Sequence, residues 1–158
     1  MTGEWTRGEF SISSDPARID LDVVHGFLTT SYWAEGIPRD LVQKSIEHSL
    51  CFGLYHHRRQ IGFARVITDR ATFAYLGDVF VLEAHRGQGL AQWMMEVVHA
   101  HPELQGFRRW VLLTRDAHEL YRKAGYTPLA NPDRYMERWA PDAYRGGGPE
   151  RGRARPRS

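Results

Sequence analysis

The stretch VFVLEAHRGQGLAQWMMEVV, residues 79–98, constrains the fold more than any other part of the chain. Apolar residues typical of a buried strand give way to a loop with glycines at positions 87 and 89. A helix over 89–100 is predicted directly after the loop, because apolar residues there recur at helical spacing. These residues are Leu90, Trp93, Met94, Val97 and Val98. The loop therefore joins a strand to the N-terminus of a helix.

Such a loop can bind an anion. The first amides of a helix have no intrahelical partner and lie at the positive end of the helix dipole. Gly87 and Gly89 let the backbone approach a phosphate closely, and Arg86 adds positive charge. Ala91 is small enough for the helix to pack tightly on a sheet. Two common phosphate loops are excluded by spacing: there is no G-x-x-x-x-G-K-S/T run, and Gln92 stands where a G-x-G-x-x-G loop needs its third glycine.

The rest of the chain predicts one mixed α/β domain over residues 1–144. A chain of 158 residues is long enough to bury its own core. Asp15 and Asp116 are expected to cap the first and the last helix, and Gly125 to end the last one. Helices are predicted at 15–33, 39–50, 89–100 and 116–124, and strands at 9–14, 51–57, 60–68, 71–82, 108–114 and 134–140. This order lacks the regular alternation of a dinucleotide-binding sheet.

The basic charge of the chain is concentrated at its C-terminus. Five of the 21 Lys and Arg residues lie in 145–158, together with one of the 19 Asp and Glu residues. The remainder is slightly acidic, which argues against a specific nucleic-acid partner. The segment 145–158 has too little apolar surface to order itself, so we expect a disordered basic tail without a function.

The cysteine and histidine contents exclude several other classes of protein. The single Cys51 excludes an intrachain disulfide and favours a reducing compartment. No apolar run reaches about 18 residues, so no membrane partner is expected and the cytoplasm is the predicted location. His56 and His57 lie in a predicted hairpin turn, and neither they nor His99 and His101 show zinc-ligand spacing with a third partner. No metal is therefore expected.

The loop and its helix resemble the acyl-CoA signature of the GNAT superfamily of N-acetyltransferases. The family pattern, Q/R-x-x-G-x-G/A, is matched by Arg86, Gly89 and Ala91 in HRGQGLA. A later run, ELYRKAGY, resembles the second signature of the family, an aliphatic residue followed by Tyr-x-x-x-Gly-aromatic. The resemblance implies a GNAT-like fold, with a mixed, mostly antiparallel central sheet flanked by helices. That sheet would splay between its fourth and fifth strands, here 71–82 and 108–114.

The same resemblance implies acetyl-CoA as the cosubstrate. The pantetheine arm would lie in the split and pair with the backbone of 79–81, and the pyrophosphate would lie on the amides of 87–92. Thr114 stands where many relatives have an asparagine that bonds the pantetheine. The residues expected to contact acetyl-CoA are Val79, Phe80, Val81, Arg86, Gly87, Gln88, Gly89, Leu90, Ala91, Gln92 and Thr114.

The implied reaction is acetyl transfer to a primary amine by direct attack in a ternary complex. Tyr121, which shares the second signature with Gly125 and Tyr126, is the expected proton donor to the CoA thiolate. The N–H of Val81 is expected to polarise the thioester carbonyl. The alternative is a catalytically inactive GNAT-fold module that binds acyl-CoA and regulates another process.

The general base stays open between several groups. An alkylamine must lose a proton before it attacks, because its pKa is near 10. Asp78 could act through water, but strand alternation places it on the face opposite Tyr75 and Gly77, so a structural role is at least as well supported. Glu83 and Glu35 are further candidates, and a water chain is another.

The acceptor site is expected around the segment 29–40 and the strand face that carries Tyr75. Tyr32 and Trp33 could form an aromatic wall, and Glu35 could bind a positively charged amine. The competing interpretation is that Trp33 packs in the core and Glu35 is solvated. The expected acceptor is a small molecule or a peptide, and the family resemblance suggests a homodimer.

Overall fold

The computed structural model describes residues 2–145 of the chain. Over these residues the chain forms a six-stranded sheet in the order β1-β2-β3-β4-β5-β6. Neighbouring strands are antiparallel except β5 and β6, which are parallel. The strands are β1 Glu4–Arg7, β2 Phe10–Ser13, β3 Leu50–His56, β4 Arg59–Thr68, β5 Phe73–Val81 and β6 Arg109–Val111. The predicted mixed, mostly antiparallel sheet is confirmed.

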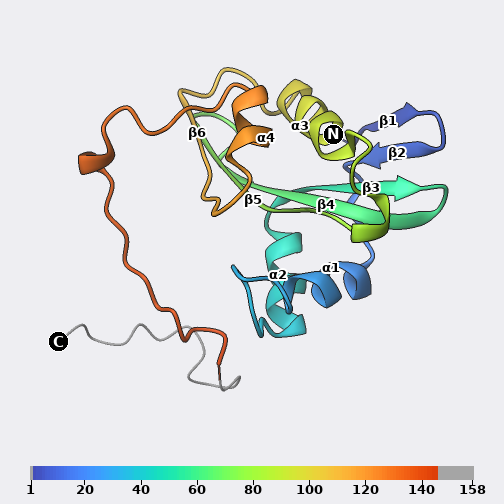
Figure 1. The fold of residues 1–158 in the computed structure, drawn as a ribbon, viewed down its shortest axis with the longest axis horizontal. Helices are drawn as coiled ribbons and strands as arrows, with labels where there is room; N and C mark the ends of the chain where they lie inside the picture. Colours follow the sequence, from blue (N-terminus) through green and yellow to red (C-terminus); the bar gives the residue numbers. More distant parts are fainter. Residues whose placement is uncertain (1, 146–158) are drawn as a thin grey trace.

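Helices cover both faces of this sheet. Figure 1 shows α1 and α2 on one face and α3 and α4 on the other. The α-helices are α1 Leu21–Leu28, α2 Arg39–Glu47, α3 Leu90–Ala100 and α4 His118–Lys123, and short 3-10 helices span Pro16–Arg18, Glu83–His85 and Pro132–Arg134. One apolar cluster joins the sheet to α3 and contains Phe52 and Met94, and a second joins it to α1 and α2 and contains Val24 and Phe63.

The helix after the glycine loop is confirmed. Every residue predicted to face the core, from Leu90 to Val98, is buried in α3. The helix ends at Ala100, and Pro102 follows shortly after that end. Packing on the sheet therefore fixes the helix N-terminus on which the loop ends.

The first predicted helix, 15–33, is wrong in its extent. Asp15 caps only the short 3-10 helix that follows it. The backbone is extended at Ile19, and Asp20 then caps α1 by accepting from two backbone N–H groups. A second capping aspartate thus interrupts a helix that periodicity alone would continue. α1 itself ends at Leu28.

Two predictions near the C-terminus are also wrong. α4 begins at His118 with Ala117 at its N-cap, so Asp116 does not cap it. Among the described residues, 134–140 form no strand, and the Met136 side chain is 97% exposed. An alternating sequence favours extended backbone, but a strand also needs a neighbouring edge to pair with.

The N-terminal end of the chain adds a strand to the sheet, and most of the C-terminal tail lies outside the described residues. The sequence does not predict β1, which pairs antiparallel with β2 at the edge of the sheet. The predicted tail 145–158 lies outside the described residues apart from Arg145. No helix within 2–145 is long and apolar enough to cross a membrane.

The sheet opens between β5 and β6. Parallel pairing joins only residues 73–75 of β5 to 109–111 of β6. Along 76–81, no strand in the described part of the chain pairs with this edge of β5. The predicted splay is therefore present, and it leaves free backbone directly before the glycine loop.

Candidate active site

The free edge of β5 directs the backbone groups of Val81 into the split. The N–H of Leu82 donates to the carbonyl of Ile61 on β4 at 2.7 Å. Successive amides of a strand point to opposite edges, so the N–H and C=O of Val81 point away from β4. The carbonyl of Phe80 faces β4 instead. Val81, and Val79 two residues before it, are therefore the positions that can pair with an extended ligand.

The glycine loop reaches α3 through left-handed backbone. The φ angles of Gly87 and Gly89 are 81° and 75°, values that favour glycine. A Cβ at either position would meet nothing within 4 Å. The glycines are therefore needed for the turn of the backbone, and the space in front of them is open. Gly89 is the N-cap of α3 and makes no side-chain cap, so the first amides of the helix stay available.

Side chains of the loop fix it to the end of β5. Arg86 Nε donates to the carbonyl of Val81 at 2.9 Å. Gln88 Nε2 donates to the carbonyl of His85 at 3.2 Å. These bonds hold the loop in its turn and keep the guanidinium charge of Arg86 next to the split.

A cavity of about 330 Å³ lies against the loop and brings the two signatures together. Ala91 and Gln92 line it from α3, and Leu120 and Lys123 line it from α4. Lys123 is a residue that the sequence analysis missed, although its place inside the second signature could have indicated it. Lys123 and Arg86 add positive charge to the lining of this cavity, which also contains Glu119.

Tyr121 lies in α4, the helix from which Leu120 and Lys123 line the cavity at the loop, and close to the phenols of Tyr32 and Tyr75. Its side chain is buried, with 9% exposed. Burial, followed by the nearby phenols of Tyr32 and Tyr75 and the carboxylate of Asp116, raises the pKa of Tyr121 to about 12. The phenol therefore stays protonated at neutral pH and can donate a hydrogen bond.

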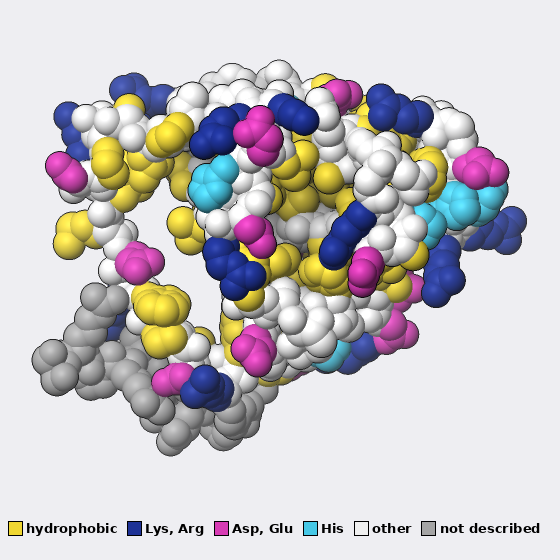
Figure 2. All heavy atoms as spheres, viewed as in Figure 1, with side chains coloured by type: hydrophobic (Ala, Val, Ile, Leu, Met, Phe, Trp, Pro, Cys, Tyr) yellow, Lys and Arg dark blue, Asp and Glu magenta, His cyan; other side chains and the backbone are white. Residues whose placement is uncertain are grey.

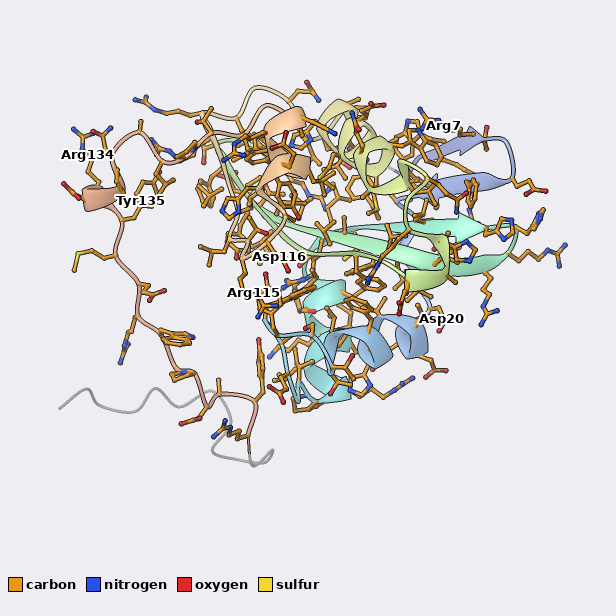
Figure 3. All side chains as sticks on the ribbon, in the orientation of Figure 1. Arg7, Asp20, Arg115, Asp116, Arg134 and Tyr135 are labelled. Atoms are coloured by element: carbon orange, nitrogen blue, oxygen red, sulfur yellow. The ribbon has the colours of Figure 1, made fainter. Side chains whose placement is uncertain are left out.

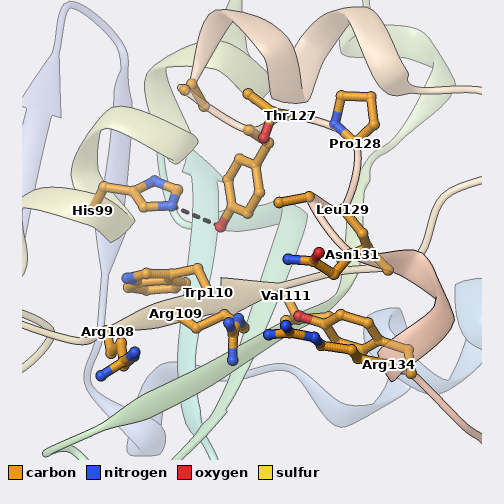
Figure 4. A pocket seen from close by; sticks show the side chains of 15 residues that line it. His99, Arg108, Arg109, Trp110, Val111, Thr127, Pro128, Leu129, Asn131 and Arg134 are labelled. Carbon is orange, nitrogen blue, oxygen red and sulfur yellow. Dashed lines mark hydrogen bonds between the residues drawn. The ribbon is translucent and has the colours of Figure 1, made fainter.

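The second signature ends α4 as predicted. Gly125 has a φ of 96°, and its N–H donates to the carbonyl of Arg122 at 3.0 Å. Tyr126 bonds His99 Nε2 on α3 through its hydroxyl at 2.9 Å (Figure 4). His99 Nδ1 lies 2.7 Å from the carbonyl of Met95, and because a carbonyl can only accept, Nδ1 carries the proton and Nε2 accepts. Burial lowers the pKa of His99, so the neutral ring is favoured.

Thr114 lies at the start of the turn into α4. Its Oγ1 accepts from the N–H of Ala117 at 3.0 Å. A hydroxyl that accepts one bond keeps its own proton to donate. Thr114 can therefore still bond a carbonyl of an extended ligand, as the resemblance implies.

The segment between α1 and α2 reaches across to the chain that follows β6. The hydroxyl of Tyr32 accepts from the N–H of Arg115 at 3.0 Å, and the Arg115 guanidinium lies 3.8 Å from the Tyr32 ring centroid. Figure 3 shows Arg115 and Asp116 close to the layer of α1 and α2. Trp33 lies edge-on against Tyr32 with ring centroids 5.1 Å apart. Both rings are substantially exposed, so they form an aromatic surface rather than core.

Asp78 ties this aromatic surface to the sheet. Its carboxylate accepts from Trp33 Nε1 at 2.8 Å and from Arg65 Nε at 2.7 Å. The side chains of Arg65 and Asp78 are only 18% and 11% exposed. Arg65 also donates to Ser49 Oγ at 3.2 Å. Arg65 and Arg115 were not predicted, because their partners lie far away in the sequence.

A β-bulge determines where Asp78 lies. One residue of β4, Ala64, stands opposite two of β5, Asp78 and Val79. Asp78 has a φ of 55°, which is uncommon for a residue with a side chain. The bulge interrupts the simple alternation assumed from the sequence. Asp78 comes close enough to Tyr75 that its charge, after burial, raises the pKa of Tyr75.

The two glutamates considered as bases lie on the surface. Glu35 is exposed in the segment that carries Tyr32 and Trp33. Glu83 is exposed in the 3-10 helix that follows β5. Neither glutamate is a hydrogen-bond partner of Asp78, whose carboxylate is bonded by Trp33 and Arg65.

A larger cavity, of about 710 Å³, lies elsewhere at the edge strand β6. It is lined by His99, residues 108–111, residues 124–131, Arg134 and Tyr135 (Figure 4). None of the glycine loop lines it. Since it lacks both the free edge of β5 and the anion loop, we place the candidate active site in the split and not in this larger space.

Comparisons with known proteins identify the family of this chain. The family model described as an acetyltransferase (GNAT) domain matches residues 47–128. A candidate acetyltransferase of Gibberella zeae is 35% identical over an alignment of 142 positions, and the match covers 75% of this chain and 79% of that protein.

Solved structures show the same fold. A candidate GNAT acetyltransferase of Xanthomonas campestris pv. campestris is 50% identical with a TM-score of 0.84, and the match covers 86% of this chain and 96% of that chain. A GNAT family acetyltransferase of Elizabethkingia anophelis, solved with acetyl-CoA bound, is 14% identical with a TM-score of 0.60 over 83% of this chain and 88% of that chain. These relatives, together with the split sheet and the glycine loop, show that the chain belongs to the GNAT family of acetyltransferases.

Proposed function

We propose that this acetyltransferase moves an acetyl group from acetyl-CoA to a primary amine while both substrates are bound. The observation that carries this proposal is the free edge of β5, which leads directly to the uncapped N-terminus of α3. An extended pantetheine can pair with that edge, and a pyrophosphate can accept from the first amides of the helix.

The residues around the split fit acetyl-CoA in shape and in charge. The space in front of Gly87 and Gly89 is open, so a phosphate can come close to their backbone. Arg86 and Lys123 supply positive charge around the same cavity. The backbone groups proposed to contact the cosubstrate are those of Val79, Val81, Gln88, Leu90, Ala91 and Gln92, with the hydroxyl of Thr114 on the pantetheine.

The chemistry forms one C–N bond and breaks one C–S bond. The amine attacks the thioester carbonyl, and the N–H of Val81 stabilises the negative charge that develops on oxygen. The intermediate then expels the CoA thiolate, to which Tyr121 donates a hydrogen bond. Because the pKa of Tyr121 is about 12, above the 8.5 or so of an ordinary thiol, solvent completes the proton transfer.

We assign Asp78 a positioning role. Both of its oxygens already accept hydrogen bonds, from Trp33 and from Arg65. A carboxylate whose two oxygens already accept hydrogen bonds holds its partners in place. The proton of the amine then leaves through water in the split, with the exposed Glu35 and Glu83 as further candidate bases.

The proposed acceptor is a small molecule or a peptide that carries a primary amine. Tyr32, Trp33 and Tyr75 offer aromatic faces, and Glu35 offers a negative charge in the same segment as Trp33. A protonated amine is attracted to both kinds of group before it loses its proton. We also propose a cytoplasmic location, where the free thiol of Cys51 stays reduced.

The proposed assembly is a homodimer. Met136 and Trp139 are 97% and 65% exposed in the segment after α4, and β6 is an edge strand of the sheet. Exposed apolar side chains and an unpaired edge both favour association. Light scattering should give twice the mass of the monomer, and a Met136→Glu, Trp139→Glu variant should give the monomer mass. A monomeric wild type would contradict this assembly.

A titration of acetyl-CoA into the Gly89→Glu variant tests the cofactor site. A carboxylate at the helix N-terminus would repel the pyrophosphate, so affinity should fall about 100-fold or more. Gly89→Asn is the matched control, because asparagine tolerates left-handed backbone and carries no charge, and it should stay within about tenfold of the wild type. Equal binding by wild type and Gly89→Glu would contradict the proposed site.

A further inference from the structure

Two histidines and a glutamate meet at the end of the sheet formed by the β3–β4 turn. Figure 2 shows histidine and acidic side chains gathered at this end of the molecule. β2 pairs with β3 so that Phe10 stands opposite His56. Glu9, just before β2, therefore lies beside the turn, and its carbonyl accepts from the N–H of His57 at 3.1 Å. The sheet thus supplies the third partner that the sequence alone did not show for this histidine pair.

The distances between the side-chain atoms suit a single ion. His56 Nε2 lies 3.3 Å from Glu9 Oε2, and His57 Nε2 lies 3.8 Å from Glu9 Oε1. One donor atom from each of the three residues lies within 4.8 Å of the other two. Ligands about 2.1 Å from a zinc ion stand about 3.4 Å apart, so only small side-chain rotations are required.

Backbone conformation explains why two adjacent histidines can act together. Neighbouring residues of a strand point to opposite faces, which would separate their rings. His57 instead has a φ of 55° in the turn after β3. The ring centroids of His56 and His57 are therefore only 4.5 Å apart. The turn presents both imidazoles to the same space beside Glu9.

A third histidine stands close to this group. The ring of His85 lies 5.3 Å from that of His56. His85 ends the 3-10 helix after β5, and its carbonyl accepts from Gln88 of the glycine loop. An ion held here would therefore connect the β3–β4 turn to the loop that receives the phosphates.

We propose that Glu9, His56 and His57 form a binding site for a divalent transition-metal ion of the zinc type, with His85 as an additional ligand. Two imidazoles and one carboxylate are a common ligand set for zinc, and imidazole favours zinc, nickel and copper over magnesium and calcium. Residues 9, 56 and 57 lie outside the lining of the cavity at the loop, whereas His85 is part of that lining.

Calorimetric titration of Zn²⁺ into untagged, chelator-treated full-length protein tests the site. We expect one ion per chain, and we expect His56→Ala, His57→Ala to lose this binding. His48→Ala, His118→Ala is the matched control, because it removes two exposed histidines elsewhere and should bind as the wild type does. Glu9→Gln should weaken Zn²⁺ binding at least about tenfold. Even residues that only hydrogen-bond to a metal ligand typically cost that much affinity when they are mutated.

Thermal melting supplies a second readout that does not depend on activity. Zn²⁺ should raise the Tm of the wild type and of the control, and leave that of the His56→Ala, His57→Ala variant unchanged. Acetyl-CoA titration should show that this variant is folded and still binds its cosubstrate. A wild type that binds no Zn²⁺, or a double variant that binds it as the control does, would overturn the proposal. If His85→Ala binds Zn²⁺ as tightly as the wild type does, His85 is not a ligand of the ion.

Discussion

The side of the split that we propose binds the cosubstrate, here the cofactor side, and the side that we propose binds the amine, here the acceptor side, are built in opposite ways. The cofactor side comes mainly from one continuous stretch, 79–92, which runs from the free edge of β5 through the glycine loop into α3. The acceptor side is assembled from Tyr32 and Trp33, Arg65, Asp78 and Arg115, which come from separate parts of the chain. Local backbone geometry makes the first side, and long-range hydrogen bonds make the second.

This difference decides which side can be altered on its own. A change in the loop acts on backbone amides and on left-handed φ angles, both of which belong to a few neighbouring residues. A change at Asp78 releases two partners, one in the α1–α2 segment and one on β4. The acceptor side should therefore couple stability to substrate binding more strongly than the cofactor side does.

The largest effect is expected at Tyr121, where the two sides meet. Tyr121→Phe removes only the hydroxyl, so kcat should fall about 100-fold while the affinity for acetyl-CoA changes less than about threefold. Single-turnover kinetics and a parallel acetyl-CoA titration measure these quantities. Unchanged kcat would remove Tyr121 from the chemistry, and a wild type that binds acetyl-CoA but acetylates no amine would favour the regulatory module.

Asp78→Ala should disturb the acceptor side alone. Losing the carboxylate leaves Arg65 and Trp33 without their partner, so the free energy of unfolding should fall by about 3 kcal/mol. The KM for the amine should rise, and the Kd for acetyl-CoA should stay within about twofold. Urea denaturation and steady-state kinetics measure the two effects.

Asp78→Asn is the matched control for that substitution. Asparagine tolerates the left-handed φ of 55° and keeps an oxygen for Trp33, but it replaces the charged oxygen that accepts from Arg65 with an NH2 group, which cannot accept. We expect about half the stability loss of Asp78→Ala. An Asp78→Ala variant as stable as the wild type would show that the network does not hold the acceptor side.

A smaller, pH-dependent effect is expected at His99, which connects α3 on the cofactor side to Tyr126. Burial lowers the pKa of His99 below its ordinary value of 6.5, so the unfolded chain binds the proton more readily than the folded one. The stabilisation is fully present above pH 6.5 and is lost as the pH falls through the lowered pKa. The slope from this one residue is at most about 1.4 kcal/mol per pH unit.

His99→Gln should reduce the loss of folding stability at acid pH. Urea denaturation at pH 7.5 and at pH 5 should show a smaller stability difference in the variant than in the wild type. Glutamine keeps a polar end near Tyr126 but does not titrate in this range. The same pH dependence in both proteins would mean that other groups cause the acid loss.

No effect at all is expected from removing residues 145–158. The proposed phosphate contacts lie in the loop and at the N-terminus of α3, so the truncated protein should bind acetyl-CoA with unchanged affinity. Calorimetry on both proteins would show this. A large loss of binding on truncation would move part of the anion site into the arginine-rich segment.

Several features of this molecule could be predicted because their causes are local. The α3 face from Leu90 to Val98 follows from a period of 3.6 residues, and the glycines at 87, 89 and 125 follow from backbone that only glycine adopts easily. The extent of the first helix could not be predicted as well, because a second capping aspartate competed with the periodicity. The strand predicted at 134–140 does not form. A strand needs a neighbouring strand to pair with, and the local sequence does not show whether one is available.

The amino-acid sequence by itself determined the loop, its helix and the second signature, since each depends on residues within a turn or two of one another. Only the tertiary structure decided what surrounds them. A bulge in β5 turned Asp78 toward Arg65 and Trp33, and strand pairing brought Glu9 to the two histidines of a distant turn. Such contacts depend on register and on bulges, and one residue of shift in a strand moves each side chain to the other face.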